Sequence, residues 1–198
     1  MNLPNRLTVA RLVMVPLFVA FMSFDHVALY ICAYVTFFVA TMTDYYDGKI
    51  ARDRNLVTNF GKLLDPLADK VLMAAAFIMM MSVSELWVPG WVIIVILARE
   101  FLVTGGRSLA AAEGKIIAAN RWGKTKTVFQ MVYIYTFLFL AIAGRVADIW
   151  WPTQVKTFNY YLSPVSLWAI IFVAGYTVYS GVQFARVNWQ VLNLKEDA

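Results

Sequence analysis

Long apolar stretches dominate the chain and are separated by short polar segments. A helix rises about 1.5 Å per residue, so roughly 20 apolar residues cross the hydrocarbon core of a bilayer. Only helices and closed barrels satisfy their backbone hydrogen bonds in lipid, and strand-like alternation of barrel length is absent from the sequence. The pattern therefore predicts an all-α membrane protein with six transmembrane helices, at residues 7–24, 27–48, 63–83, 87–107, 126–147 and 160–186.

Composition agrees with that pattern. The 198 residues are 61% hydrophobic, and the mean hydropathy of +0.66 is well above that of an ordinary soluble domain. Internal repeats and linker-like tracts are not evident, so we expect a single domain over residues 1–198. Residues 1–11, which contain Arg6 and Arg11, are predicted to form an interfacial helix that leads into the first span.

The distribution of basic residues predicts the topology. With six spans, segments 1–11, 49–62, 108–125 and 187–198 lie on one side, and most Lys and Arg residues lie there or beside it. The opposite side keeps only Arg145 and Lys156. The positive-inside rule then places both termini in the cytoplasm. An aromatic belt is expected at the other interface, formed by Trp87, Trp91, Trp150, Trp151, Tyr160 and Tyr161.

Four aspartates lie where apolar spans meet the predicted cytoplasmic surface. Asp44 and Asp47 are spaced i, i+3, and Asp65 and Asp69 are spaced i, i+4, so each pair shares a helix face. Helices joined by a short loop are neighbours, so we expect the two pairs to converge. Clustered carboxylates repel one another, and divalent cations relieve that repulsion. Oxygen ligands without His or Cys nearby favour Mg²⁺ or Mn²⁺ over Zn²⁺.

Residues around the aspartates suit a phosphate ligand. Gly48 follows Asp47, and Gly61 lies one turn before Asp65; a residue without a Cβ lets a ligand approach the backbone closely. Arg52, one turn beyond Gly48, offers a planar fork that matches phosphate. Together these features predict a pyrophosphate site and phosphoryl-transfer chemistry. The net charge of +5 suits an anionic leaflet or anionic substrates, and no nucleic-acid partner is expected.

The same residues carry a resemblance to a known family. Asp44-Tyr-Tyr-Asp-Gly-Lys-Ile-Ala-Arg52, then eight residues, then Gly61-Lys-Leu-Leu-Asp-Pro-Leu-Ala-Asp69, resembles the CDP-alcohol phosphatidyltransferase signature at every fixed position. The flanking stretches NLPNRLTVAR, ILAREFLVTGGR and GKTKT resemble members whose acceptor is sn-glycerol 3-phosphate. The resemblance implies transfer of the phosphatidyl group of CDP-diacylglycerol to that acceptor, in phospholipid biosynthesis at the bacterial inner membrane.

The resemblance also implies a fold and a set of roles. Family members have six transmembrane helices around a polar cavity that faces the cytoplasm, usually in a homodimer. Two metal ions are implied, both bridged by Asp44 and Asp65, with Asp47 on one ion and Asp69 on the other. Asp69 is also the implied general base. The residues implied to bind CDP-diacylglycerol are Asn5, Thr8, Gly48, Ala51, Arg52, Thr58 and Gly61.

The acceptor needs a phosphate site of its own. Glu100, Thr104 and Arg107 share one stripe of the fourth predicted span, and Lys124 and Lys126 open the fifth from the same side. Because ionisable residues within spans usually face a bundle interior or a cavity, Arg107, Lys124 and Lys126 are the candidates for holding that phosphate. The alternative is that these basic residues only set topology, and that Glu100 pairs with basic neighbours on its own helix.

Two other readings of the function stay open. The same chemistry could use inositol phosphate, serine or phosphatidylglycerol as the acceptor. A cation transporter is the alternative from another class, because intramembrane carboxylates often mark ion pathways. Transporter sites, however, lie near the bilayer midplane in broken helices of repeated halves, whereas these aspartates lie at one interface beside Arg52.

Overall fold

The computed structural model describes residues 3–53, 59–115, 117–118 and 121–189, with side chains for 7–44, 67–115, 117–118 and 121–189. All regular structure within this part of the chain is helical, which confirms the predicted all-α class. The helices are α1 (Leu3–Met22), α2 (Val27–Asp53), α3 (Asn59–Met80), the 3₁₀ helix η1 (Ser84–Leu86), α4 (Gly90–Ala112), α5 (Arg121–Trp150) and α6 (Pro152–Val187). Each predicted apolar stretch thus forms one α-helix.

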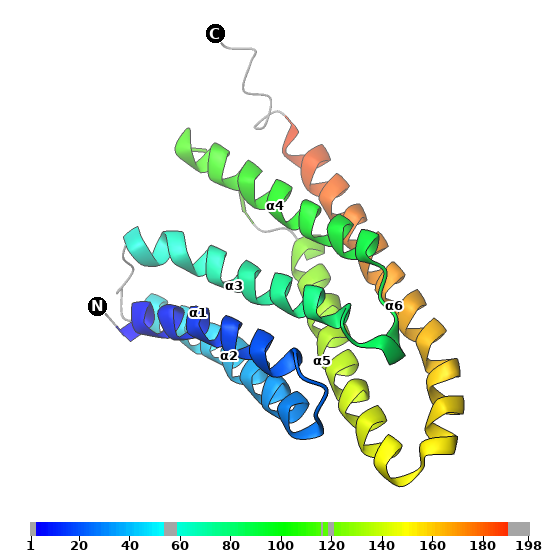
Figure 1. The fold of residues 1–198 in the computed structure, drawn as a ribbon. Helices are drawn as coiled ribbons and strands as arrows, with labels where there is room; N and C mark the ends of the chain where they lie inside the picture. Colours follow the sequence, from blue (N-terminus) through cyan, green and yellow to red (C-terminus); the bar gives the residue numbers. More distant parts are fainter. Residues whose placement is uncertain (1–2, 54–58, 116, 119–120, 190–198) are drawn as a thin grey trace.

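The α-helices run up and down in an elongated bundle (Figure 1). The start of α1, the end of α2, the start of α3 and the ends of α4 and α6 lie toward one end of the molecule. The α1–α2 turn, η1 and the α5–α6 turn lie toward the other end. The segments that carry the four aspartates therefore share an end of the bundle with the described start of the chain.

Helix α1 is continuous from Leu3 to Met22, so residues 3–11, which were expected to form an interfacial helix leading into the first span, are the first turns of the helix that forms that span. These residues continue directly into the first apolar stretch, because nothing between Leu3 and Arg11 interrupts the helical hydrogen bonds. Pro16 lies within the helix. The same helix packs against both α2 and α3, and so joins the two elements on which the aspartates lie.

A single aromatic-rich core holds the bundle together. Phe18 of α1, Phe37 of α2 and Phe77 of α3 are almost completely buried, and the ring centroids of Phe18 and Phe37 are 5.8 Å apart. Tyr135 of α5 packs edge-on against Phe37, with 5.3 Å between centroids. Lipid tails are as apolar as these side chains, so in a membrane close packing rather than water exclusion stabilises such contacts.

Local sequence explains where α4 ends and where α6 begins. After α4, Gly114 adopts a φ of +75°, a left-handed conformation that glycine tolerates and that commonly ends helices. The Lys115 N–H then donates to the Ala110 carbonyl at 2.8 Å. Pro152 lies in the first turn of α6, where its missing N–H costs no helical hydrogen bond.

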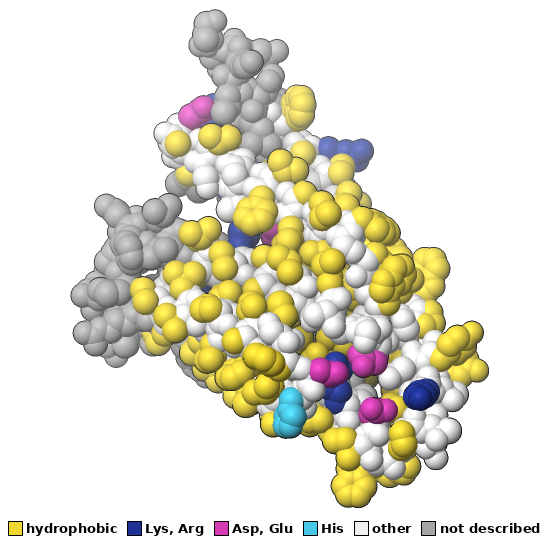
Figure 2. All heavy atoms as spheres, viewed as in Figure 1, with side chains coloured by type: hydrophobic (Ala, Val, Ile, Leu, Met, Phe, Trp, Pro, Cys, Tyr) yellow, Lys and Arg dark blue, Asp and Glu magenta, His cyan; other side chains and the backbone are white. Residues whose placement is uncertain are grey.

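The outer surface is that of a membrane protein. Figure 2 shows a face on which hydrophobic side chains predominate. By length and composition, three described segments can cross a membrane, Val27–Asp44, Arg121–Trp150 and Pro152–Val187, and Leu7–Met22 is a shorter apolar helix. Helix α4 carries three charged residues, Arg99, Glu100 and Arg107. The six residues of the predicted aromatic belt are all exposed, at the end of the bundle that holds η1 and the α5–α6 turn.

Arg145 of α5 joins three segments at that end. Its guanidinium pairs with Asp25 in the α1–α2 connection and with Glu85 of η1 at 3.5 Å. It also lies over the ring of Tyr30, 4.2 Å from the centroid. The Arg145 side chain is only 12% exposed, whereas its partners Asp25 and Glu85 are 76% and 36% exposed. One side chain therefore links α2, η1 and α5.

We expect Arg145→Ala to lower the thermal stability of the protein. The substitution removes two ion pairs and a cation–π contact from a shielded position, which should cost roughly 1–3 kcal/mol. The measurement is thermal unfolding in detergent micelles. Lys156→Ala is the matched control, because Lys156 lines the same 250 Å³ cavity as Arg145 but is exposed. Equal unfolding temperatures for the two variants would show that Arg145 does not stabilise the fold.

Candidate active site

The Asp44 carboxylate is approached from within the bundle by an arginine. Arg11 Nη1 lies 2.6 Å from Asp44 Oδ1. The Arg11 side chain is fully buried, whereas that of Asp44 is 41% exposed. Thr8, one turn before Arg11, is buried as well. Arg11 thus balances the charge of Asp44 from inside and leaves the carboxylate accessible from outside.

Sequence reasoning gave Arg11 only a role in topology. The structure adds it to the candidate site as the partner of the first signature aspartate. A signal was present in the sequence, because Arg11 falls inside the first apolar stretch, where an ionisable residue usually has a partner or a function. The identity of that partner could not be read from the sequence, since Asp44 lies on another helix.

For most other signature residues, the structure describes only their position on a helix. Asp47, Gly48, Ala51 and Arg52 lie in the last turns of α2, and Gly61 and Asp65 lie in the first turns of α3. Their side chains, and that of Asn5 on α1, are outside the described part of the structure, as is Thr58 altogether. Among the side chains that are described, no group of three or more possible metal ligands occurs. Of the four aspartates, that set includes only Asp44 and Asp69.

Asp69 of α3 borders two cavities. The larger one has a volume of about 250 Å³, and the smaller one of about 50 Å³. Both are lined by Asp69, Lys70, Glu100, Lys126 and Thr127. The larger cavity is also lined by Arg99, Val103, Thr104, Arg107, Gly123 and Lys124. The three residues predicted to hold the acceptor phosphate are therefore gathered in one cavity, beside the predicted general base.

The larger cavity is strongly cationic. Five basic side chains and two acidic ones line it, which gives a formal charge of +3; they are Lys70, Arg99, Arg107, Lys124, Lys126, Asp69 and Glu100. A cleft lined mainly by one sign of charge concentrates ligands of the opposite sign. The cavity thus suits a small anion and opposes the entry of a cation.

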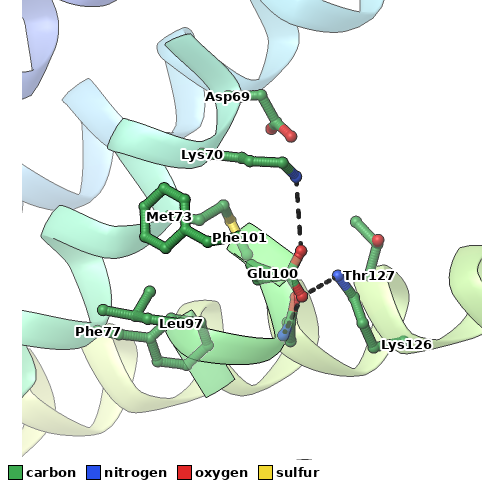
Figure 3. Close-up of a pocket in the computed structure, with 10 residues that line it drawn as sticks. Asp69, Lys70, Met73, Phe77, Leu97, Glu100, Phe101, Lys126 and Thr127 are labelled. Atoms are coloured by element: carbon green, nitrogen blue, oxygen red, sulfur yellow. Dashed lines mark hydrogen bonds and ion pairs between the residues drawn. The ribbon is translucent and has the colours of Figure 1, made fainter. Parts of the chain in front are cut away.

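Glu100 of α4 is the centre of this group of charges (Figure 3). Lys126 Nζ donates a hydrogen bond to Glu100 Oε1, and Gln130 Nε2 donates to the same oxygen at 3.3 Å. Arg99 Nη1 is 3.6 Å from Oε1, and Lys70 Nζ is 3.5 Å from Oε2. The partners of Glu100 come mainly from α3 and α5, so pairing within its own helix is only part of its role.

Lys126 has a different environment from the other two members of the predicted phosphate-binding trio. It is 5% exposed, and its ammonium is engaged by Glu100. Lys124 is exposed on the same helix. Arg107 lies over the ring of Phe184, 5.3 Å from its centroid, and its buried Nε has no hydrogen-bond partner among the described residues. Arg107 and Lys124 are therefore the cations most open to an anionic ligand.

Comparison with known proteins identifies the family of the chain. The family model described as CDP-alcohol phosphatidyltransferase matches residues 1–178, and the chain belongs to that family. The Bacillus subtilis (strain 168) CDP-diacylglycerol–glycerol-3-phosphate 3-phosphatidyltransferase is 37% identical, over 96% of this chain and 97% of its own length. Its namesake in Rickettsia bellii is 35% identical, over 90% and 92%. A probable phosphatidylglycerophosphate synthase of Mycobacterium tuberculosis (strain H37Rv) is 41% identical, over 72% and 68%.

Family members generally use divalent metal ions, and the described residues fit such ions. Carboxylate oxygens are the ligands that hard divalent cations prefer. The Asp44 carboxylate is partly exposed and Asp69 is only partly buried, so neither aspartate is enclosed by protein on all sides. Helix α1 packs against both α2 and α3, and so connects the helices that carry the two aspartates.

We expect Lys126→Ala to lower the stability of the fold as well as activity. Removing one partner of a buried ion pair leaves the other charge uncompensated, which costs roughly 3–5 kcal/mol. Lys70 and Arg99 remain near Glu100, so the loss should fall toward the lower value. The measurement is thermal unfolding, with Lys124→Ala as the exposed control on the same helix. If both variants unfolded at the wild-type temperature, Lys126 would not be needed to neutralise Glu100.

Proposed function

We propose that this protein transfers the phosphatidyl group of CDP-diacylglycerol to sn-glycerol 3-phosphate and releases CMP. It would then act as a CDP-diacylglycerol–glycerol-3-phosphate 3-phosphatidyltransferase in phospholipid biosynthesis. The observation that carries the proposal is the cationic cavity of about 250 Å³ in which Arg107 and Lys124 lie beside Asp69. The names of relatives that align with nearly the whole chain support the same substrates.

The nucleotide half of the site is proposed to lie along the signature segment. Asp44, Asp47, Asp65 and Asp69 would hold two ions, Mg²⁺ or Mn²⁺, and the residues that bind CDP-diacylglycerol would be Asn5, Thr8, Gly48, Ala51, Arg52, Thr58 and Gly61. When bound, the ions would neutralise charge that develops on the pyrophosphate. Arg11 would orient Asp44 from the buried side, where Arg11 Nη1 lies 2.6 Å from Asp44 Oδ1.

The acceptor half is proposed to lie in the cationic cavity. Arg107 and Lys124 would hold the phosphate of sn-glycerol 3-phosphate, with Lys126 contributing its charge from behind Glu100. Asp69 would accept the proton of the acceptor's 1-hydroxyl. The hydroxyl oxygen then bonds to the phosphorus that carries diacylglycerol, and the bond from that phosphorus to the oxygen of CMP breaks. CMP leaves with the electron pair of that bond.

The membrane arrangement is proposed to follow the distribution of charge. All six α-helices would span the bacterial inner membrane as one domain over residues 1–198, with both termini and the cavity facing the cytoplasm and a homodimer as the assembly. The shared end of the bundle at which α1 and α3 start and α2 and α4 end (Figure 1) supports this orientation, because these ends carry the aspartates and most basic residues.

The charge of the cavity also helps to distinguish between the alternative functions and acceptors. A formal charge of +3 around the binding space opposes a cation, which argues against a cation transporter. Serine carries no phosphate and would leave Arg107 and Lys124 without a partner. Inositol phosphate and phosphatidylglycerol do carry one. The preference for glycerol phosphate over these two rests on the relatives.

The proposed function predicts metal-dependent release of CMP. Purified protein in micelles should release CMP from labelled CDP-diacylglycerol fastest with sn-glycerol 3-phosphate, in a panel that includes serine, inositol phosphate and phosphatidylglycerol. EDTA should abolish turnover, and Mg²⁺ or Mn²⁺ should restore it. Asp69→Asn is the negative control and should lose at least about 10²-fold in turnover. Full activity in excess EDTA would refute the role of the metals, and faster release with another acceptor would reassign the substrate.

We expect Arg107→Ala to weaken use of the acceptor more than use of the lipid. Hydrogen bonds to charged groups contribute roughly 1.5–3 kcal/mol, which is on the order of 10- to 150-fold. The KM for glycerol phosphate should rise, or kcat/KM should fall, within that range, while the KM for CDP-diacylglycerol moves only a few-fold. Arg52→Ala should raise the KM for CDP-diacylglycerol more than the KM for glycerol phosphate. Unchanged glycerol phosphate kinetics in folded Arg107→Ala would place the acceptor phosphate elsewhere.

A further inference from the structure

The two carboxylate oxygens of Glu100 differ in their hydrogen-bond partners. Oε1 accepts hydrogen bonds from Lys126 and Gln130 and also lies near Arg99. Oε2 has Lys70 Nζ as its nearest cation among the described residues, at 3.5 Å, which is beyond ordinary hydrogen-bond length. An ionised carboxylate offers about four acceptor positions over its two oxygens. Oε2 therefore keeps acceptor capacity that the described residues do not use.

That oxygen belongs to a carboxylate that borders the reaction space. Glu100 and Asp69 line the same two cavities, and in Figure 3 the Lys70 ammonium extends from α3 toward Glu100 on the side where Asp69 lies. A second carboxylate is of no use for holding phosphate, because it repels an anion. It is well suited to accept a hydrogen bond from an alcohol hydroxyl, which is a charge-assisted bond.

The spacing along α4 matches a small phosphorylated polyol. Glu100 and Arg107 are seven residues apart and both line the larger cavity, with Thr104 between them. Seven residues correspond to about 10 Å along a helix. Both side chains line one cavity together with Asp69, so a ligand held there borders all three. An acceptor whose phosphate contacts Arg107 would thus present its hydroxyl groups toward Glu100 and Asp69.

We propose that Glu100 is a specificity-determining residue that accepts, through Oε2, a hydrogen bond from the hydroxyl next to the attacking one. The inference rests on the proposed function. In sn-glycerol 3-phosphate, the 1-hydroxyl faces Asp69 and the 2-hydroxyl faces Glu100. The site therefore selects phosphorylated alcohols with two adjacent hydroxyls. The cations around Oε1 fix the direction of the carboxylate.

The test compares two acceptors, sn-glycerol 3-phosphate and 3-hydroxypropyl phosphate, which lacks only the second hydroxyl. A site built to bind a hydroxyl rejects an analogue without it, so the wild-type kcat/KM should be roughly 10- to 150-fold lower for the analogue. Glu100→Gln keeps the shape of the side chain, and Glu100→Asp keeps its charge but withdraws it by one methylene. Both variants should reduce this discrimination between acceptors to a few-fold.

The ratio of kcat/KM values for the two acceptors shows whether Glu100 recognises the acceptor or only supports the fold. If Glu100 only held Lys70 and Lys126 in place, its variants would slow both acceptors equally and leave the ratio unchanged, which would overturn the proposal. Thr177→Val is the matched control, because buried Thr177 accepts from Gln130 at 3.3 Å but does not line either cavity. The ratio of kcat/KM values for the two acceptors should be the same in Thr177→Val as in the wild type.

The wild type alone can overturn the proposal, whether or not the variants fold. Equal use of the two acceptors by wild-type protein would overturn the role of Glu100 and leave the proposed function intact. Absence of CMP release with either acceptor, in protein that binds CDP-diacylglycerol, would refute the proposed function and this inference with it. Strong rejection of the analogue by the wild type, lost in either Glu100 variant, supports the proposal.

Discussion

A carboxylate inside an apolar bundle must be compensated by cations near it, because the interior solvates charge far less well than water does. Glu100 meets this requirement with Lys126 from α5, Lys70 from α3 and Arg99 from its own helix. The same contacts hold the helices that surround the candidate acceptor cavity. Stability of the bundle and shape of the site are therefore linked through one side chain.

The first signature aspartate depends on a similar arrangement. Arg11 lies wholly within the bundle and contacts Asp44, whose other side remains accessible. At the opposite end, Arg145 pairs with Asp25 and Glu85 and covers Tyr30. In each of these places, the charges that the apolar pattern makes costly are paired across helices. Such pairs specify which helices meet, because a misplaced helix would leave a charge without a partner.

The cationic cavity divides its basic residues into two groups. Lys126 is buried and engaged by Glu100, whereas Lys124 is exposed and Arg107 retains a buried Nε without a hydrogen-bond partner among the described residues. The first group gives the cavity its charge and rigidity, and the second can contact a ligand directly. A buried donor without a partner is costly, and Arg107 bears such a cost at Nε among the described residues.

The sequence by itself determined the helical class, the positions of the six α-helices and the membership of the family. Apolar runs of span length and a signature with fixed spacing are local features, and local features are readable along one chain. It did not reveal that residues 3–11 and the first apolar stretch form one continuous helix, α1. The cross-helix partners of Arg11, Glu100 and Lys126 were decided only by the tertiary structure. Pairing between helices depends on how the elements pack and rotate against one another, and side-chain periodicity within one helix does not contain that information.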